Sequence, residues 1–222
     1  MAGDTVSLEL RAVDREPFED GIERVGIQTD QGTIECRYHV SQSGDAAVLW
    51  VFGAGGGLGG PAGGLYIRLA GYLQSDGVAS LRLDYRIPGQ LNPCVLDVLA
   101  GINFLESEQR RQIVLVGHSF GGAVVINAAA LSPSVIAVAA LSSQTLGAGA
   151  VAELSPRPVL FMHGEADEVL PAQCSRDLYD RAGEPRQLVL YPGCRHGLDE
   201  CRNDVDHDLM RWFREMLALN GP

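Results

Sequence analysis

The stretch Gln112-Ile-Val-Leu-Val-Gly-His-Ser-Phe-Gly-Gly122 joins an apolar run of strand length to a serine between glycines, and a helical pattern follows directly. In a Gly-X-Ser-X-Gly pentapeptide between a strand and a helix, the serine lies on a strained turn that exposes its hydroxyl group. Such a turn brings backbone so close to the serine that a Cβ atom at Gly117 or Gly121 would clash. The sequence therefore predicts a nucleophile, Ser119, at the end of a buried strand.

Short apolar runs and longer helical patterns alternate on both sides of this stretch, which is typical of parallel strands joined by crossover helices. We expect strands at 47–52, 79–83, 112–116, 135–141, 158–162 and 187–191. Apolar residues at three- and four-residue spacing predict helices at 65–75, 94–106, 120–131, 172–182 and 205–219. The runs 25–29 and 33–40 flank a turn sequence and predict an amino-terminal antiparallel hairpin. The fold class is therefore α/β, with a mostly parallel central sheet and helices on both faces.

Composition and charge narrow the classes of function. The chain has 222 residues, 46% of them hydrophobic, and no repeat or linker divides it, so we expect a single domain over residues 1–222 without a cap domain. The net charge of −11 repels phosphate backbones and anionic lipids, which argues against nucleic-acid and membrane partners. Residues 1–11 lack the apolar segment of an export signal, and the apolar runs elsewhere are too short to cross a bilayer.

The cysteine pattern indicates free thiols and no metal site. The five cysteines are odd in number, widely scattered and never in Cys-X-X-Cys spacing, which fits a reducing compartment and a cytoplasmic protein. Cys194 and Cys201 lie on either side of a histidine, but without metal-ligand spacing they are interpreted as incidental thiols.

A serine hydroxyl needs a base to become a nucleophile, and the base needs a carboxylate to fix its tautomer. Asp167 lies in a loop after the strand expected at 158–162, and His196 lies in a loop after the strand expected at 187–191. The carboxyl ends of parallel strands meet at one edge of a sheet, so we expect Ser119, Asp167 and His196 to converge there.

Other side chains compete for these roles. Glu165 and Glu168 flank Asp167 and are interpreted as solvated loop charges. His163 ends a strand and His118 is the variable position before Ser119, so both are expected to pack or to line the substrate pocket. The remaining two histidines, His39 and His207, are interpreted as ordinary surface or helix residues.

Three motifs in this order resemble the α/β-hydrolase superfamily and, more narrowly, its compact dienelactone-hydrolase and small-esterase branch. They are Gly117-His-Ser-Phe-Gly121, His163-Gly-Glu-Ala-Asp167 with Val169-Leu-Pro171, and Gly193-Cys-Arg-His196. The resemblance implies an α/β-hydrolase fold in which Ser119 is the nucleophile, Asp167 orients the histidine and His196 is the base. Dienelactone hydrolases proper use a cysteine nucleophile, so the serine at position 119 departs from that activity.

A glycine-rich loop follows the strand expected at 47–52, and eight of the 27 glycines lie between Gly53 and Gly64. The resemblance implies that this loop supplies one backbone amide to an oxyanion hole, from Ala54 or Gly55, while the amide of Phe120 supplies the other. Phe52 stands where many relatives carry a histidine, so the loop's contribution is expected to come from its backbone.

The same loop also matches a dinucleotide-binding fingerprint, Gly55-X-Gly57-X-X-Gly60, with Asp84 at the end of the next strand. Pro61 and the further glycines after it lengthen the turn, however, so no tight junction would place a pyrophosphate at the start of the helix. We therefore interpret Asp84 as a structural carboxylate that pairs with Arg86.

Taken together, the motifs predict a serine hydrolase that cleaves small carboxylic esters and needs no cofactor or metal. The stretch 142–157, where relatives insert lids, is too short for a cap domain, so we expect an open site. The alternatives are a thioesterase for small acyl thioesters, a binding protein that has kept the fold without turnover, and a dinucleotide-binding oxidoreductase.

Overall fold

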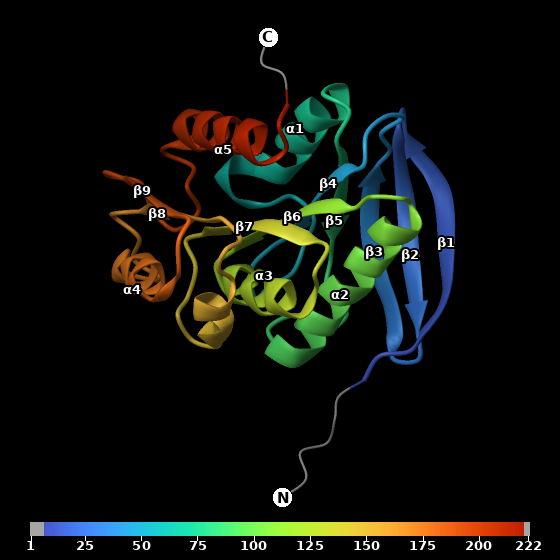
Figure 1. The fold of residues 1–222 in the computed structure, drawn as a ribbon, viewed down its shortest axis with the longest axis horizontal. Helices are drawn as coiled ribbons and strands as arrows, with labels where there is room; N and C mark the ends of the chain where they lie inside the picture. Colours follow the sequence, from blue (N-terminus) through green and yellow to red (C-terminus); the bar gives the residue numbers. More distant parts are fainter. Residues whose placement is uncertain (1–6, 220–222) are drawn as a thin grey trace, which may run out of the picture.

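A nine-stranded twisted sheet forms the centre of the protein in the computed structural model, which describes residues 7–219 (Figure 1). Its strands lie in the order β1-β2-β3-β5-β4-β6-β7-β8-β9. Strands β5, β4, β6, β7, β8 and β9 are parallel to one another, whereas β1, β2 and β3 form an antiparallel extension in which β3 pairs with β5. The bounds are β1 (Leu10–Glu19), β2 (Ile22–Thr29), β3 (Gly32–His39), β4 (Ala46–Val51), β5 (Ala79–Leu83), β6 (Gln112–His118), β7 (Val135–Leu141), β8 (Val159–Gly164) and β9 (Arg186–Tyr191).

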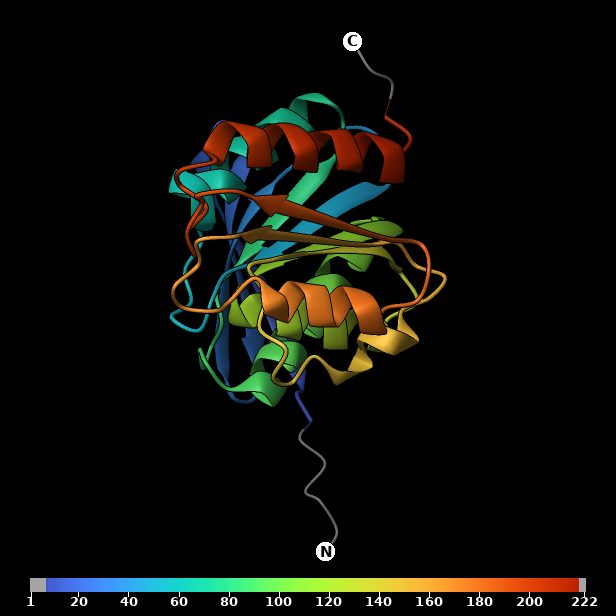
Figure 2. The ribbon, with the colours of Figure 1, turned by 90° about the vertical axis from the view of Figure 1, so that its left-hand side faces the viewer.

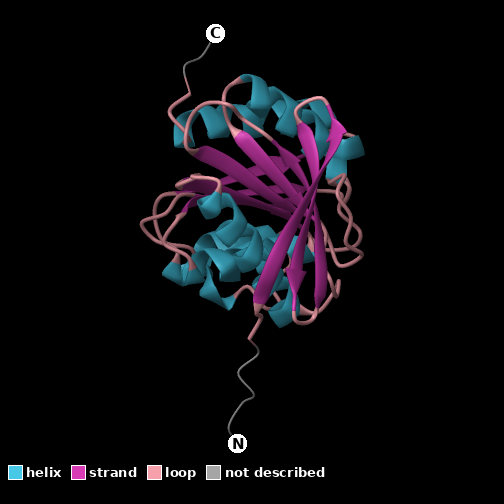
Figure 3. Ribbon diagram, turned by 90° about the vertical axis from the view of Figure 1, so that its right-hand side faces the viewer, coloured by secondary structure: helices cyan, strands magenta, loops and turns pink. Residues whose placement is uncertain are grey.

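Helices cover both faces of the sheet, as the alternating pattern predicted (Figures 2 and 3). They are α1 (Pro61–Ser75), α2 (Leu91–Ser107), α3 (Phe120–Leu131), α4 (Gln173–Arg181) and α5 (Arg202–Met216). Helices α1 and α5 pack on one face and α2, α3 and α4 on the other, which divides the buried side chains into two apolar clusters. Within residues 7–219, no helix combines the length and apolarity needed to span a membrane.

The predicted elements are all present, with small differences at their ends. The hairpin predicted at 25–29 and 33–40 corresponds to β2 and β3, but β1 had no prediction because all of its residues are exposed and carry no buried periodic pattern. Regular helix in α1 begins only after Gly64, since Ala62, Gly63 and Gly64 have positive φ. Residues 1–6, part of the stretch expected to lack an export signal, lie outside the described residues.

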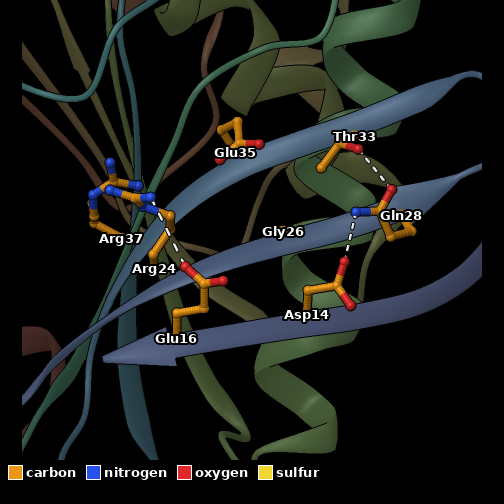
Figure 4. A pocket seen from close by; sticks show the side chains of 8 residues that line it. All are labelled: Asp14, Glu16, Arg24, Gly26, Gln28, Thr33, Glu35 and Arg37. Carbon is orange, nitrogen blue, oxygen red and sulfur yellow. Dashed lines mark hydrogen bonds and ion pairs between the residues drawn. The ribbon is translucent and has the colours of Figure 1, made fainter. Parts of the chain in front are cut away.

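A polar groove of about 380 Å³ lies on the outer face of the amino-terminal strands (Figure 4). Its side chains hydrogen-bond mainly to one another, as Gln28 Nε2 does to Asp14 Oδ2 at 2.8 Å and Thr33 Oγ1 does to Gln28 Oε1 at 2.6 Å. All of its lining residues belong to β1, β2 and β3, so the groove is separate in the fold from the loops after the parallel strands.

A buried ion pair fixes the chain between β5 and α2. Arg86 Nε donates to Asp97 Oδ1 at 2.5 Å and the Arg86 amide donates to Asp97 Oδ2 at 2.9 Å, with side chains only 3% and 0% exposed. The expected pairing of Asp84 with Arg86 is therefore wrong. Asp84 Oδ1 instead accepts a hydrogen bond from the Gly57 amide at 2.6 Å, because the glycine-rich loop folds back onto the end of β5.

Removing one partner of this pair tests its contribution to stability. Asp97→Ala leaves the Arg86 guanidinium buried without a counter-charge, so we expect a loss of about 3–5 kcal/mol in the free energy of unfolding, measured by urea denaturation. As a control, Arg176→Ala removes an exposed ion pair with Glu165 and should cost less than about 1 kcal/mol. Equal effects of the two variants would contradict a special role for the buried pair.

Candidate active site

Ser119 lies on a strained turn between β6 and α3. Its φ of 57° and ψ of −121° fall in a region that residues with a side chain rarely adopt. The Ser119 amide donates to the Leu141 carbonyl of the neighbouring strand at 2.8 Å, and the Ser119 carbonyl accepts from the Gly122 amide at 3.1 Å. The predicted turn is thus present, and both adjoining elements hold it in place.

The steric reason predicted for the two flanking glycines is confirmed. A Cβ atom at Gly117 would lie 2.1 Å from the carbonyl oxygen of Gly121, and one at Gly121 would lie 2.2 Å from the carbonyl oxygen of Phe52. Both distances are far below van der Waals contact, and both partners are backbone atoms that cannot move aside. The turn therefore depends on glycine at these positions.

Three loops at the carboxyl edge of the sheet bring Ser119, His196 and Asp167 into one hydrogen-bonded chain. His196 Nε2 lies 3.0 Å from Ser119 Oγ, and His196 Nδ1 lies 2.7 Å from Asp167 Oδ2. A carboxylate only accepts hydrogen bonds, so His196 carries its proton on Nδ1 and leaves Nε2 free to accept the serine proton. The imidazole is partly exposed at 19%, whereas the Asp167 side chain is fully buried.

Asp167 is held as a carboxylate by four hydrogen bonds. Oδ1 accepts from the amides of Val169 and Leu170, both at 2.8 Å, and Oδ2 accepts from His196 and from His163. Burial alone would raise the pKa of Asp167, but the hydrogen bonds from the Leu170 amide, His196 and the Val169 amide together lower it below its usual value. The group is therefore ionised at neutral pH.

Four of the other side chains weighed for these roles lie outside the hydrogen-bonded chain of Ser119, His196 and Asp167. Glu165 and Glu168 are exposed, and Glu165 pairs with Arg176 on α4. His207 is an exposed residue of α5, as expected. The interpretation of His39 as a surface or helix residue is wrong, because its ring is 1% exposed on β3 and its Nε2 lies 3.0 Å from Arg82 Nε.

His118 packs beneath the loop between β9 and α5 that carries His196, here called the histidine loop. Its ring is 4% exposed and lies beside Phe52, with 5.2 Å between the ring centroids. Burial lowers the pKa of His118 to about 4, so the ring is neutral at physiological pH. Its Nε2 lies 2.9 Å from the carbonyl oxygen of His196, an acceptor, so this nitrogen is the donor. His118 thus fixes the backbone of the histidine loop.

The histidine loop is closed by a disulfide between Cys194 and Cys201, whose Cα atoms lie 5.8 Å apart. The expectation that these two cysteines are incidental thiols is therefore wrong; a seven-residue separation is no recognisable pairing signal in a sequence. Among the described residues, Cys36, Cys94 and Cys174 remain free, and no group of three or more metal-ligating side chains could hold a metal ion.

The loop between β8 and α4, which carries Asp167, also packs directly against the histidine loop. The Ala166 amide donates to the Cys194 carbonyl at 3.0 Å, and the Glu165 amide donates to the Tyr191 carbonyl at 2.9 Å. A Cβ atom at Gly164 would lie 2.1 Å from the same Cys194 carbonyl oxygen. The close approach of the two loops sets the distance between Asp167 and His196.

The glycine-rich loop begins beside the serine. A Cβ atom at Gly53 would lie 3.5 Å from Ser119 Cβ. In this loop the Gly56 amide donates to the Gly53 carbonyl and the Gly57 amide donates to Asp84, whereas the hydrogen bonds found within residues 7–219 include none from the amides of Ala54 and Gly55. These two amides are therefore free of protein acceptors and suit the predicted oxyanion role.

The loop does not suit a pyrophosphate. A Cβ atom at Gly56 would lie 2.5 Å from Asp84 Oδ1, so a carboxylate already occupies the inside of the turn. Its negative charge would repel a phosphate at the place where the dinucleotide fingerprint needs one. The ring of Tyr66 also packs within 2.4 Å of the Cβ position of Gly60, the last glycine of that fingerprint.

Comparisons with known proteins agree with this fold. The sequence model of the dienelactone hydrolase family matches residues 88–211, more than half of the chain. The uncharacterized protein YfhR of Escherichia coli K12 is 32% identical over 109 residues, which cover 39% of this chain, so the chain spans 38% of the length of that curated relative.

Two solved structures show the same architecture. The structure of Est1E from Butyrivibrio proteoclasticus matches with a TM-score of 0.76 at 20% identity, covering 88% of this chain and 99% of that chain. A dienelactone hydrolase from Anabaena variabilis matches with a TM-score of 0.75 at 18% identity, covering 91% of this chain and 98% of that chain. The predicted α/β-hydrolase fold is thereby confirmed.

The steric constraint at the serine turn can be tested with one methyl group. Gly121→Ala should lower the free energy of unfolding by about 1–3 kcal/mol or more, because the new Cβ atom meets the Phe52 carbonyl. Gly71→Ala is the matched control: it lies in α1 with no atom within 4 Å of its Cβ position, and it should stabilise the protein by about 0.5–1 kcal/mol. A Gly121→Ala variant as stable as the wild type in urea denaturation would refute the clash.

Proposed function

The chain belongs to the dienelactone hydrolase family, and we propose that it is a hydrolase that cleaves small carboxylic esters through an acyl-enzyme on Ser119. The observation that carries this proposal is the unbroken hydrogen-bond chain from Ser119 through His196 to Asp167. A serine hydroxyl is a poor nucleophile at neutral pH, and a base so oriented is what acyl transfer through serine requires.

In the proposed reaction, Ser119 Oγ attacks the ester carbonyl carbon while His196 Nε2 takes the hydroxyl proton. Asp167 stays ionised and stabilises the imidazolium that forms. The tetrahedral intermediate collapses when His196 donates this proton to the leaving alkoxide, and the acyl group remains on Ser119. A water molecule activated by the same histidine then hydrolyses the acyl-enzyme and restores the serine.

The negative oxygen of the tetrahedral intermediate needs donors placed before it forms. We assign this role to the amide of Phe120, at the amino terminus of α3, and to the amide of Ala54 or Gly55. The position of Gly53 beside Ser119 supports the assignment, because the amides of Ala54 and Gly55 follow Gly53 by only one and two residues. The amino-terminal end of α3 also carries a positive partial charge that favours an anion.

The loops around Ser119 support a small substrate and an open site. The segment between β7 and β8 holds only loop and the short 3₁₀ turn Gly149–Glu153, and all nine strands join one sheet, so we propose a single domain without a cap. Apolar side chains project from three loops at the carboxyl edge, with Leu146 81%, Val169 62% and Ile87 38% exposed. Such a rim suits a compact apolar acyl group.

A fluorophosphonate probe tests the nucleophile directly, because it forms a covalent bond only with an activated serine. We expect labelling of the wild-type protein and none of Ser119→Ala, as read by intact-protein mass spectrometry. Ser75→Ala removes an exposed serine of α1 and should label like the wild type. If the folded wild-type protein takes no label, the proposed serine chemistry fails and a non-catalytic binding protein becomes the better interpretation.

A substrate panel tests which acyl groups the protein accepts and whether it prefers esters to thioesters. With p-nitrophenyl esters, kcat/KM should be highest for acetyl to butyryl groups and lower by about tenfold or more for dodecanoyl, since an open site cannot bury a long chain. Aromatic acyl esters belong in the panel because Est1E has been observed with bound ferulic acid. Faster hydrolysis of acyl-CoA thioesters than of esters with the same acyl group would favour a thioesterase instead.

A further inference from the structure

Asp167 Oδ2 accepts hydrogen bonds from two histidines. His196 Nδ1 lies 2.7 Å away and His163 Nε2 lies 3.0 Å away. His163 is the residue before the end of β8, and its side chain is fully buried, as is that of Asp167. The proposed reaction uses only His196, so the second histidine on the same carboxylate oxygen needs its own explanation.

The surroundings of His163 determine which nitrogen carries its proton. Nε2 lies 2.9 Å from the Leu170 carbonyl oxygen as well as 3.0 Å from Asp167 Oδ2, and both oxygens are acceptors, so Nε2 is protonated. Nδ1 lies 2.7 Å from the hydroxyl oxygen of Ser175, which is fully buried at the start of α4. In a neutral ring, Nδ1 accepts the hydrogen bond from Ser175.

The ring is neutral because its environment opposes a charge. Burial lowers the pKa of His163, although the Leu170 carbonyl and the Asp167 carboxylate act in the opposite direction. The other titratable groups near it are His196 on the loop after β9, whose positive charge lowers the pKa of His163 further, and His118 on β6, whose ring is itself neutral because burial lowers its pKa to about 4. His163 therefore offers Asp167 a hydrogen bond without a positive charge.

We propose that His163 is a positioning residue, whose Nε2–H, set by the Ser175 hydroxyl, holds the Asp167 carboxylate in the orientation that serves His196. The inference rests on the proposed function and adds a second serine–histidine pair that reaches the same oxygen of the aspartate. Hydrogen bonds then run from Ser175 through His163 to Asp167, and from Ser119 through His196 to the same oxygen. The carboxylate is thus held between two imidazoles.

Sharing Oδ2 also limits how strongly the aspartate attracts a proton on His196. Two N–H donors share the negative charge of this oxygen. When the His163 donor is removed, the whole charge acts on His196 and stabilises the imidazolium form of His196. The acidic limb of the pH profile of kcat/KM should then move to higher pH. A residue that merely filled space would leave this limb where it is.

The matched variants are His163→Met and His163→Gln. The two side chains have nearly the same shape, but only glutamine places an N–H donor where His163 Nε2 lies. We expect His163→Met to lower kcat for a small ester roughly tenfold, to leave KM nearly unchanged and to move the acidic limb upward. His163→Gln should retain most of kcat and the wild-type limb, and the exposed-residue control His207→Met should resemble the wild type.

Two results overturn the inference. One is a folded His163→Met variant with the kcat and pH profile of the wild type, and the other is an equal loss in the methionine and glutamine variants. The wild-type fluorophosphonate reaction separates this failure from that of the proposed function. If the wild type takes no label, the serine chemistry fails, whereas wild-type labelling with identical rates in all the His163 variants refutes the positioning role alone.

A measurement on the unaltered protein covers the case in which His163→Met does not fold. Long-range ¹H–¹⁵N correlation spectra distinguish the two neutral tautomers of a histidine and its charged form. We expect His163 to be neutral and protonated on Nε2 throughout the pH range of activity. A proton on Nδ1 alone would leave Nε2 unable to donate to Asp167 and would refute the inference without any variant.

Discussion

The close approach of backbone segments around Ser119 is the constraint on which the rest of the site depends. The serine holds a conformation that costs on the order of 1–3 kcal/mol, and it persists because β6 on one side and α3 on the other are buried too deeply to relax. Gly117 and Gly121 let the start of α3 approach the end of β4, which brings the glycine-rich loop against the nucleophile. The orientation of the hydroxyl and the position of the nearest loop amides therefore follow from one packing arrangement.

Charge around this turn is confined to few groups. Two buried histidines, His118 and His163, are neutral and act through single N–H groups, one on the backbone of the histidine loop and one on the aspartate. Asp167 is the ionised partner of His196 within the hydrogen-bonded chain, and the imidazole of His196 is partly exposed to solvent. Because the neighbouring rings stay uncharged, a positive charge that forms on His196 meets the carboxylate without competition from another cation.

Much of the fold and the centre of the site could be predicted because their signals are local. Buried parallel strands read as apolar runs, and the serine turn, Asp167 and His196 each follow such a run, so the topology brings them to one edge. Features that depend on pairing between distant residues could not be predicted. Nothing in the sequence pairs Asp97 with Arg86 rather than Asp84, and the Cys194–Cys201 bond and the burial of His39 depend on how loops and strands meet in space.

The irregular first strand, β1, forms one edge of the sheet and affects whether that edge can pair with another molecule. A terminal strand presents unpaired amide and carbonyl groups that can template the addition of a strand from another molecule. In β1 the pairing register with β2 shifts between Leu10 and Ala12 and again between Pro17 and Glu19, and the proline has no amide hydrogen to offer. Charged residues occupy several of the positions between these irregularities. The strand that adds least to the core thereby interrupts the flat edge on which amyloid-like stacking would begin.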